Sequence, residues 1–395
     1  MGYGGGGGGG GGSGGGGSGG GGGGAAGYGD AGAGGSGAGG GSGYRRVGDD
    51  RTAPGLKVNN ITNRTEDGGP EVDGIVEVNT TAHFIPPVGN TAERGSRGRG
   101  VISGGTTGSR VNTIQYVTIA TTGNSSDFGD LSAALSSSGS VSSSTRGINL
   151  GGAPGPSAVS NVMQYVTISS TGNAFDFGDM TDTHGSLVGV SDGIRGVFTF
   201  GSTPVSDTLE FITIASKGNS SIYGGKLTIS TGRKQLASCS SPTRGLFAGG
   251  RDNGNTVLNS IDYITIQTQG NAQDFGDLVG LQFGQGGCSS STRGLFAGGK
   301  DPAFTNRIDL VTIASLGDAI DFGDLTRSEI FMSGTSNNIR GIFAGGVNDT
   351  PSSDTRKDTI DYVTIASAGN ATDFGNLLAA IESPTAFSDS HGGLG

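Results

Sequence analysis

Acidic residues at a recurring position are the first candidates for chemistry in this chain. Five copies of the tripeptide Asp-Phe-Gly begin at Asp127, Asp176, Asp274, Asp321 and Asp373. Carboxylates hold calcium when enough oxygen ligands converge, and Asn271 near one copy would add another oxygen. The spacing nevertheless matches no complete calcium loop and lacks its acidic closing ligand. We therefore expect a hydrogen-bonded turn at these positions, with no metal and no cofactor.

The residue types that commonly catalyse reactions form no recognisable catalytic motif in this sequence. Asp-Phe-Gly binds magnesium in protein kinases, but here it recurs without the glycine-rich loop, the lysine and the His-Arg-Asp sequence that accompany it there. His83, His184 and His391 stand far apart in the sequence, and no Ser-His-Asp or Cys-His pairing can be read from it. We expect that the protein is not an enzyme.

The two cysteines occupy equivalent positions in neighbouring repeats. Cys239 lies five residues before Arg244, and Cys288 lies five residues before Arg293. A disulfide would need their Cα atoms within about 7 Å of each other. We expect instead two small buried side chains on adjacent strands.

Six arginines mark the start of each repeat and have two interpretations. They are Arg99, Arg146, Arg195, Arg244, Arg293 and Arg340. The favoured interpretation is that each arginine pairs with an aspartate of a neighbouring Asp-Phe-Gly-Asp segment through charge-assisted hydrogen bonds. The alternative is a positive ring that receives an acidic ligand. The third repeat, which reads Ser-Ile-Tyr-Gly-Gly-Lys-Leu over 221–227, lacks both aspartates and so tests the pairing.

The repeat itself predicts an all-β fold. The Arg-Gly pairs are separated by 47, 49, 49, 49 and 47 residues. A period of this length with several short β runs per unit is typical of a propeller. Within one unit we expect strands at 246–248 and 261–266, a turn at 270–271, a short edge strand around Phe275 to Leu278, and a Ser/Thr-rich strand over 236–243 near a central axis. One unit alone buries too few apolar side chains to fold, so the units must pack together.

The C-terminus predicts how the ring closes. Residues 383–394 resemble the Ser/Thr-rich strand that precedes each Arg-Gly pair, and Phe387 falls where other repeats carry Val141 or Cys239. We expect this segment to pair beside the strand that begins near Arg99. The result is six blades and a strand-exchange closure.

Two segments precede the propeller, which we assign to residues 99–395. Residues 1–43 are almost entirely glycine and bury nothing that would offset the entropy of ordering them, so we expect a disordered tether. In an oligomer they would instead pack as a shaft of extended polyglycine chains. Residues 44–98 carry candidate strands at 56–61 and 74–78, which predict a small β-ribbon and a linker. Two strands alone are marginally stable, so this segment is expected to dock on a partner.

Composition narrows the partners. The formal net charge of −10 and the pI of about 4.7 argue against nucleic acid and anionic membranes. No apolar run approaches the ~18 residues of a membrane span, and the N-terminus has no secretory signal pattern.

The loops after each Gly-Gly pair are the candidate binding regions, because they differ in length and content. Their polar residues are Arg251, Asp252, Asn253, Lys300, Asp301, Asn348, Asp349, Arg356 and Lys357. Loops on a rigid scaffold often carry recognition. The alternative is that they are ordinary solvent-exposed turns.

The repeat resembles a known family in its pattern. An apolar strand ending in Gly-Gly, a variable loop, a Tyr-bearing strand and an aromatic residue ahead of a Leu resemble the kelch repeat over residues 99–395. Kelch units usually carry Trp at the place held here by Phe128, Phe177, Phe275, Phe322 and Phe374, and this chain has no Trp. The resemblance implies a six-bladed kelch-like β-propeller used mainly for binding.

A narrower resemblance concerns the exact residues of the motifs. Arg-Gly-Leu-Phe-Ala-Gly-Gly at 293–299, Asp-Phe-Gly-Asp-Leu at 274–278 and the polyglycine head before 55–62 are similar to virion structural proteins of tailed phages of marine cyanobacteria. Those proteins are mostly known as tail-fibre-like or unassigned virion components. The resemblance implies a place on the particle surface.

The expected function is therefore a non-enzymatic virion component, a decoration or a tail-fibre-like appendage. Other virion proteins would contact residues 1–98, and a host surface polysaccharide or protein would contact the propeller loops. One alternative is a kelch-type scaffold that binds a protein outside any virion. A carbohydrate-active enzyme is a third, less favoured class.

Overall fold

The structure is a computed structural model that describes residues 98–202, 204–350 and 353–394. The predictions for the tether (1–43) and the ribbon (44–98) lie outside the described residues, except for Gly98. The described residues belong to one compact unit, Thr80–Gly395. They contain 27 strands and one short 3₁₀ helix, η1 (Gly392–Leu394), and no helix among them could span a membrane.

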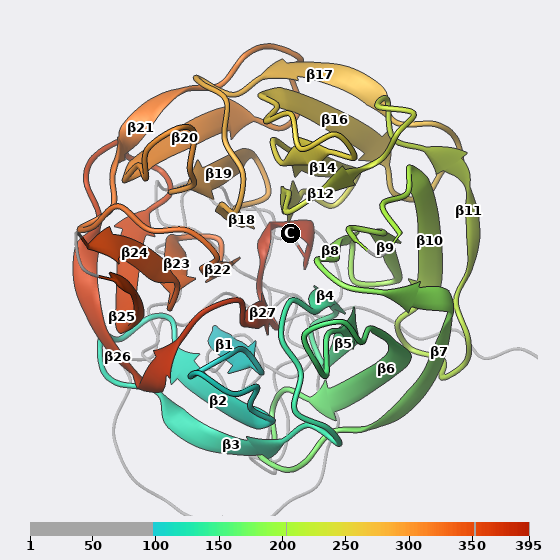
Figure 1. Ribbon diagram of the computed structural model, residues 1–395, viewed down its shortest axis with the longest axis horizontal. Coiled ribbons are helices and arrows are strands. Elements are labelled where there is room, and N and C mark those ends of the chain that lie inside the picture. Colours follow the sequence, from blue (N-terminus) through green and yellow to red (C-terminus); the bar gives the residue numbers. More distant parts are fainter. Residues whose placement is uncertain (1–97, 203, 351–352, 395) are drawn as a thin grey trace, which may run out of the picture. The chain divides into compact units, whose positions relative to one another are not determined.

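Six antiparallel sheets stand around a central axis, as the sequence predicts (Figure 1). Each sheet is one blade, and its innermost strand is short and rich in small residues. The inner strands of blades 1 to 6 are β27 (Thr385–Ser388), β4 (Gly139–Ser142), β8 (Val188–Ser191), β13 (Ala237–Ser240), β18 (Gly286–Ser289) and β22 (Ser333–Ser336).

The next three strands of each blade follow in order from the axis to the rim. The second strands are β1 (Arg99–Ser103), β5 (Arg146–Gly152), β9 (Arg195–Thr199), β14 (Arg244–Ala248), β19 (Arg293–Ala297) and β23 (Arg340–Ala344). The third strands are β2 (Thr113–Thr118), β6 (Ser160–Thr167), β10 (Thr208–Thr213), β16 (Ser260–Thr265), β20 (Arg307–Thr312) and β25 (Ser353–Thr364). The outer strands are β3 (Ser126–Asp130), β7 (Phe175–His184), β11 (Ser221–Lys226), β17 (Gln273–Asp277), β21 (Ile320–Asp324) and β26 (Thr372–Ile381).

Three further strands belong to the loops. β12 (Arg233–Lys234) pairs with β15 (Arg251–Asp252), and β24 (Val347–Thr350) pairs with the start of β25. A second strand such as β14 buries every residue after its arginine, whereas an outer strand such as β17 buries the aromatic of Asp-Phe-Gly and exposes the aspartates on either side of it. This gradient explains why the motif Leu-Phe-Ala reads as a continuous apolar run.

The predicted closure is confirmed. β27, from the C-terminus, pairs antiparallel with β1, with Phe387 opposite Val101 and Ser388 opposite Gly100. The chain thus completes its first blade with its last strand. With this closure the second strand of every blade has a paired strand on both sides.

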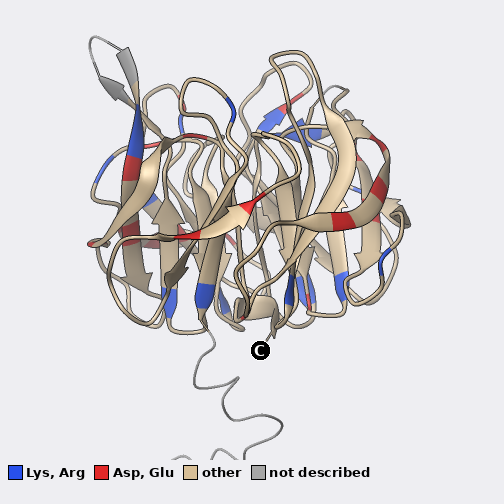
Figure 2. Cartoon of the chain, turned by 90° about the horizontal axis from the view of Figure 1, so that it is seen from below, with Lys and Arg blue, Asp and Glu red and all other residues tan. Residues whose placement is uncertain are grey.

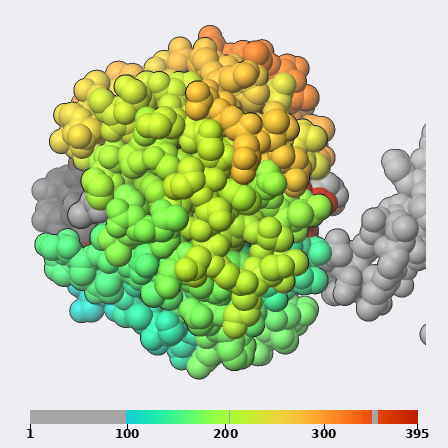
Figure 3. All heavy atoms as spheres, turned by 90° about the vertical axis from the view of Figure 1, so that its right-hand side faces the viewer, coloured from blue at the N-terminus to red at the C-terminus, as the bar shows by residue number. Residues whose placement is uncertain are grey.

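The apolar core lies between blades rather than within them. Six of the seven core clusters in the described residues lie between the sheets of two neighbouring blades; one joins Ile148 and Phe177 of blade 2 to Phe198 and Ile212 of blade 3. The seventh lies under the loop face and contains Phe283, Ile330 and Val347. This arrangement is why a single repeat cannot fold alone. Seen from the rim, the outer strands of adjoining blades form one continuous surface (Figure 3).

The glycine of each Arg-Gly pair allows this close packing. A Cβ added at Gly294 would lie 2.5 Å from the Cys239 sulfur, and one added at Gly341 would lie 2.5 Å from the Cys288 sulfur. Each inner strand therefore presses a side chain onto the glycine of the next blade. The cysteines are free, buried side chains on adjacent inner strands, as expected.

The disc has two faces, which we name by their contents. The arginine face carries the six repeat arginines, where the second strands begin, and the chain ends on this side (Figure 2). The loop face lies at the opposite ends of these strands. It carries the loops that follow Gly-Gly and the β24–β25 hairpin.

Candidate ligand-binding site in the central channel

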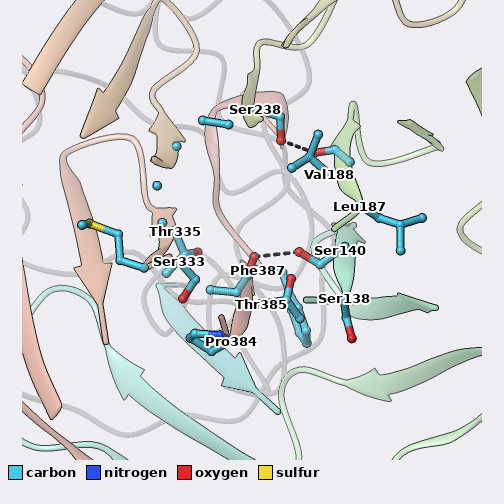
Figure 4. Close-up of a pocket in the computed structure, with 18 of the residues that line it drawn as sticks. Ser138, Ser140, Leu187, Val188, Ser238, Ser333, Thr335, Pro384, Thr385 and Phe387 are labelled. Atoms are coloured by element: carbon cyan, nitrogen blue, oxygen red, sulfur yellow. Dashed lines mark hydrogen bonds between the residues drawn. The ribbon is translucent and has the colours of Figure 1, made fainter. Parts of the chain in front are cut away.

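The six inner strands enclose a cavity, the central channel. Its volume is about 500 Å³, and all six inner strands line it (Figure 4). Ligand pockets commonly have volumes in the range of roughly 300–1,000 Å³. The channel has three levels, which we call the floor, the waist and the mouth.

The waist is lined by small residues. They are Ser140, Gly189, Ser238, Gly287, Gly334 and Ala386. A Cβ added at Gly287 would lie 2.3 Å from the Ser238 carbonyl oxygen, so the inner strands approach each other closely here. Ser140 Oγ donates to the Ala386 carbonyl at 2.8 Å, and Ser238 Oγ donates to the Gly189 carbonyl at 2.8 Å (Figure 4). Both waist hydroxyls are therefore used in joining blades.

The floor, near the arginine face, is a ring of serines that end the six inner strands. They are Ser142, Ser191, Ser240, Ser289, Ser336 and Ser388. Five of them donate an Oγ–H to the carbonyl of the serine in the preceding blade, over 2.6–2.9 Å. The bond that would join Ser240 to Ser191 is the one not formed among these six.

The C-terminal turn fills that gap and closes the floor. A Cβ added at Gly393 would lie 1.8 Å from the Ser191 carbonyl oxygen and 2.8 Å from Ser240 Oγ. His391 Nδ1 accepts a hydrogen bond from Gly393 N over 3.0 Å, so the proton is on Nε2, which donates to the Ser142 carbonyl over 3.2 Å. Burial lowers the pKa of His391 to about 4, so this imidazole is neutral at pH 7.

The mouth, on the loop face, is a ring of six half-buried or buried turn residues. They are Ser383, Ser137, Ser186, Gln235, Gly284 and Phe331, for blades 1 to 6. All six have a left-handed φ between 54° and 76°. Five backbone N–H groups each donate to the carbonyl of the preceding blade over 2.7–2.9 Å. The backbone ring is therefore nearly six-fold, whereas its side chains differ.

Both rings are interrupted at the same junction, between blades 3 and 4. No bond from Gln235 N to the Ser186 carbonyl occurs at the described mouth, just as Ser240 does not bond to Ser191 at the floor. The connection from Leu227 to β13 is two residues longer than its counterpart from Leu278 to β18. This longer connection carries Arg233.

The predicted pairing of the repeat arginines with aspartates is wrong. Each guanidinium instead donates to backbone carbonyls at the end of the third strand of the next blade, over 2.8–3.4 Å. The pairs are Arg99 with Ile168, Arg146 with Ile214, Arg195 with Ile266, Arg244 with Ile313, Arg293 with Ile365 and Arg340 with Ile119. Five of the six guanidinium groups also lie over an aromatic ring of their own blade, at 4.4–4.9 Å.

The reason for this correction is geometric. The arginines begin the second strands, close to the axis, whereas Asp127, Asp176, Asp274, Asp321 and Asp373 are exposed on the outer strands. The third repeat lacks the aspartates, yet Arg146 still reaches the Ile214 and Ala215 carbonyls at 2.9 Å. The arginines join blade to blade, but through the backbone.

The Asp-Phe-Gly segments form a second joint at the rim. The phenylalanine carbonyl accepts a hydrogen bond from the glycine of the Gly-Asn turn (Gly-Asp at 317–318) in the next blade, for example Gly317 N to Phe275 over 2.9 Å. The glycine of the tripeptide is required by close approach, since a Cβ at Gly276 would lie 2.6 Å from the Gly317 backbone. No group of three or more potential metal ligands occurs in the described part of the chain.

The described histidines lie far apart in the structure, and both cysteines are buried. His184 is buried and stacks on Phe200 at 3.8 Å between centroids, whereas His391 lies in the floor. Burial raises the pKa of both thiols, Cys239 and Cys288, so neither is a reactive thiolate at neutral pH. His83 lies outside the described residues.

The predicted binding-loop residues all lie on the loop face; four of them contact their own loops, and Arg251 contacts the connection that precedes β18. Arg251 lies over the Phe283 ring at 3.3 Å, and Lys300 lies over the Phe304 ring at 4.4 Å. Asp252 accepts from Thr256 N, Asn348 accepts from Thr355, and Lys357 donates to Thr355. Asn253 and Asp301 are exposed, and the side chain of Asp349 is not among those described.

Only Arg356 among these residues reaches the channel, through a partner. It forms two hydrogen bonds, of 2.7 and 3.0 Å, to Glu382, which lines the mouth. The longest loop is therefore tied to the rim of the channel. The other predicted loop residues lie outside the channel lining.

Two buried junction sites were missed by sequence reasoning. Arg233 and Asp262 form an ion pair of 2.9 Å with both side chains fully buried, at the junction of blades 3 and 4. The equivalent place at the junction of blades 5 and 6 holds Glu329, whose pKa is raised to about 7 by burial and by Asp361. The insertion before Arg233 was the available signal, because alignment of the repeats exposes it.

The serine floor was also missed, although its signal is plain once the repeats are aligned. Five of its serines stand four residues before a repeat arginine, as Ser289 stands before Arg293. The mouth residues left no such signal, because their types differ between repeats. No protein-family model matches this sequence, and no curated protein is significantly similar to it.

Proposed function

We propose that this protein is a non-enzymatic structural component of a phage virion, a decoration or a tail-fibre-like appendage on the particle surface. Residues 1–98 would contact other virion proteins, and the loop face of the propeller would bind a ligand on the host surface. The repeat motifs and the polyglycine head resemble those of virion proteins of cyanobacterial phages, and this resemblance supports a location on the particle surface.

The observation that carries the binding role is the contrast between the two faces. On the arginine face the same arginine, serine and carbonyl contacts recur from blade to blade. On the loop face the backbone repeats while the side chains of the mouth and the loops differ. A scaffold that varies only on one face concentrates recognition there.

The alternative is a kelch-type scaffold that binds another protein outside any virion. The same variable loop face supports this function, and only the location separates the two. A carbohydrate-active enzyme remains a third class. Glu382 is the one carboxylate in the described channel lining, and it forms an ion pair with Arg356.

Mass spectrometry of purified phage particles tests the location. We expect peptides of this chain in particles that have been separated from lysate by density-gradient centrifugation. Absence of the chain from such particles contradicts the virion role and favours the scaffold. The purified full-length chain should also slow adsorption of the phage to its host if the loop face binds the host surface.

A further inference from the structure

The mouth of the channel is a basin that could hold one or two sugar units. The cavity of about 500 Å³ opens between the six mouth residues and is closed at its other end by the C-terminal turn. A ligand must therefore enter from the loop face and end inside the cavity. This geometry suits the terminus of a chain rather than its middle.

One side of the mouth offers an apolar platform. Phe331 is half-buried at the rim, and its ring covers the neighbouring Gly284, where an added Cβ would lie 3.1 Å from two ring carbons. Phe283 supports it at 6.3 Å between centroids. A bulky residue in the left-handed region costs conformational energy, and such strain tends to accompany functional positions. The aliphatic face of a sugar ring packs well on such a platform.

The opposite side of the mouth offers hydrogen-bonding groups. Ser383, Ser137 and Ser186 follow one another around the rim, and Gln235 comes next. The Gln235 Oε1 atom is buried and has no hydrogen-bond partner among the described residues. A buried acceptor without a partner costs free energy, and a ligand hydroxyl would recover it when the Gln235 carboxamide turns toward the cavity. Hydroxyl and amide groups beside an aromatic ring are the usual surroundings of a bound sugar.

The described lining carries one acidic and one basic side chain near the mouth, Glu382 and Arg110. Glu382 is neutralised by Arg356, and Arg110 donates to the Ala153 carbonyl over 3.2 Å. The neutral imidazole of His391 lies at the floor. The described lining therefore offers no unpaired carboxylate to a basic ligand, and its cation, Arg110, already donates to a backbone carbonyl. The contacts left for a ligand are those of the aromatic ring, the hydroxyls and the amide, which suit neutral groups.

From these observations we infer that the mouth of the channel binds the terminal unit of a neutral saccharide, stacked on Phe331 and hydrogen-bonded to Gln235 and the rim serines. The inference rests on the proposed binding function of the loop face and names its ligand class. It places recognition at the channel rather than at the outer loops.

A glycan array probed with the purified full-length chain tests the ligand class. We expect neutral glycans to give the strongest signals, and acidic glycans with the same core to bind no better. For the strongest neutral glycan, isothermal titration should show about tenfold weaker binding for Phe331→Ser, a residue that three other blades carry at this place. Ser137→Trp should abolish binding by filling the mouth.

Phe304→Ser is the matched control, since Phe304 is a half-buried aromatic of the loop face that does not line the channel. Its affinity should stay within about twofold of the original. Thermal unfolding of each variant checks its fold, and Phe331→Ser carries the test if Ser137→Trp does not fold.

Three results overturn the inference: strongest binding to sulfated or carboxylated glycans, unchanged affinity in Phe331→Ser, or no glycan bound at all. Loss of binding in loop variants such as Asn253→Ala, with Phe331→Ser unchanged, overturns the inference and leaves the proposed function standing. Absence of the chain from purified particles contradicts the virion role alone. It leaves the inference about saccharide binding in the channel standing.

Discussion

The floor and the mouth of the channel are built from the same six repeats, yet they differ in what is repeated. At the floor the side chain recurs, because each serine hydroxyl bonds to the next blade. At the mouth only the backbone recurs, and the side chains are free to change. Ring closure therefore restricts the residue type where side chains form the hydrogen bonds between blades. Where the backbone forms these bonds, the residue type can vary.

The junction of blades 3 and 4 lacks the bond of both rings. Here the C-terminal turn replaces the missing serine bond, and the buried pair of Arg233 and Asp262 fills the space beneath the loop face. The pair of Arg233 and Asp262 is fully buried, whereas the related pair of Arg307 and Asp309 leaves its arginine partly exposed. Variants at this junction should have the largest effects on stability.

Replacing Arg233 by methionine should give the largest loss. The change leaves the Asp262 carboxylate buried without its cation, which typically costs about 3–5 kcal/mol. Chemical denaturation of the full-length chain at pH 7 measures it. The double variant Arg233→Met with Asp262→Asn should recover part of the loss, and a loss below about 1 kcal/mol for the single variant would show that the pair does not hold the junction.

The junction of blades 5 and 6 should respond to pH. Glu329 has a folded-state pKa of about 7, raised by burial and by Asp361 and opposed by Arg327 and Lys357. The folded state therefore binds a proton that the unfolded state releases between pH 4.5 and 7, so stability falls as pH rises through this window. Glu329→Gln, which does not titrate, should be more stable than the original by about 2–3 kcal/mol at pH 8 and nearly equal at pH 4.5.

Thermal unfolding of Glu329→Gln and the original chain across this pH range measures the difference. Glu382→Gln is the control, since Glu382 is partly exposed and paired with Arg356. A difference between Glu329→Gln and the original that does not change with pH contradicts the account of this junction.

The smallest expected changes in stability come from replacing a floor serine and a mouth serine of the same blade. Ser142 Oγ donates to the Ser388 carbonyl over 2.8 Å, so Ser142→Ala should cost about 1–2 kcal/mol. Ser137 lies at the mouth and its side chain joins no blades, so Ser137→Ala should change stability by less than about 0.5 kcal/mol. Equal losses from the two variants in urea denaturation would remove the distinction.

The sequence was sufficient to predict the ring and its closure. The spacing of the Arg-Gly pairs gave six units, and the likeness of residues 383–394 to the inner strands placed β27 beside β1. The partner of each arginine was not predictable in this way. Backbone carbonyls leave no trace in a sequence, so the aspartates appeared to be the natural partners although they lie on the rim.

The candidate site was predicted only in outline. The loops after Gly-Gly were expected to carry recognition, and one of them reaches the channel through Arg356 and Glu382. The mouth residues could not be found, because a left-handed turn is occupied here by serine, glutamine, glycine and phenylalanine alike. Their convergence is a property of the closed ring rather than of any segment.

The central claim is that repeated residues build the ring and that unrepeated residues at its mouth bind the ligand. Measuring the unfolding free energy and the affinity for the strongest neutral glycan on Ser142→Ala and Phe331→Ser tests it most directly. The account predicts that Ser142→Ala loses stability and keeps its affinity, whereas Phe331→Ser loses about tenfold in affinity and keeps its fold. Loss of affinity in Ser142→Ala together with full affinity in Phe331→Ser would contradict it.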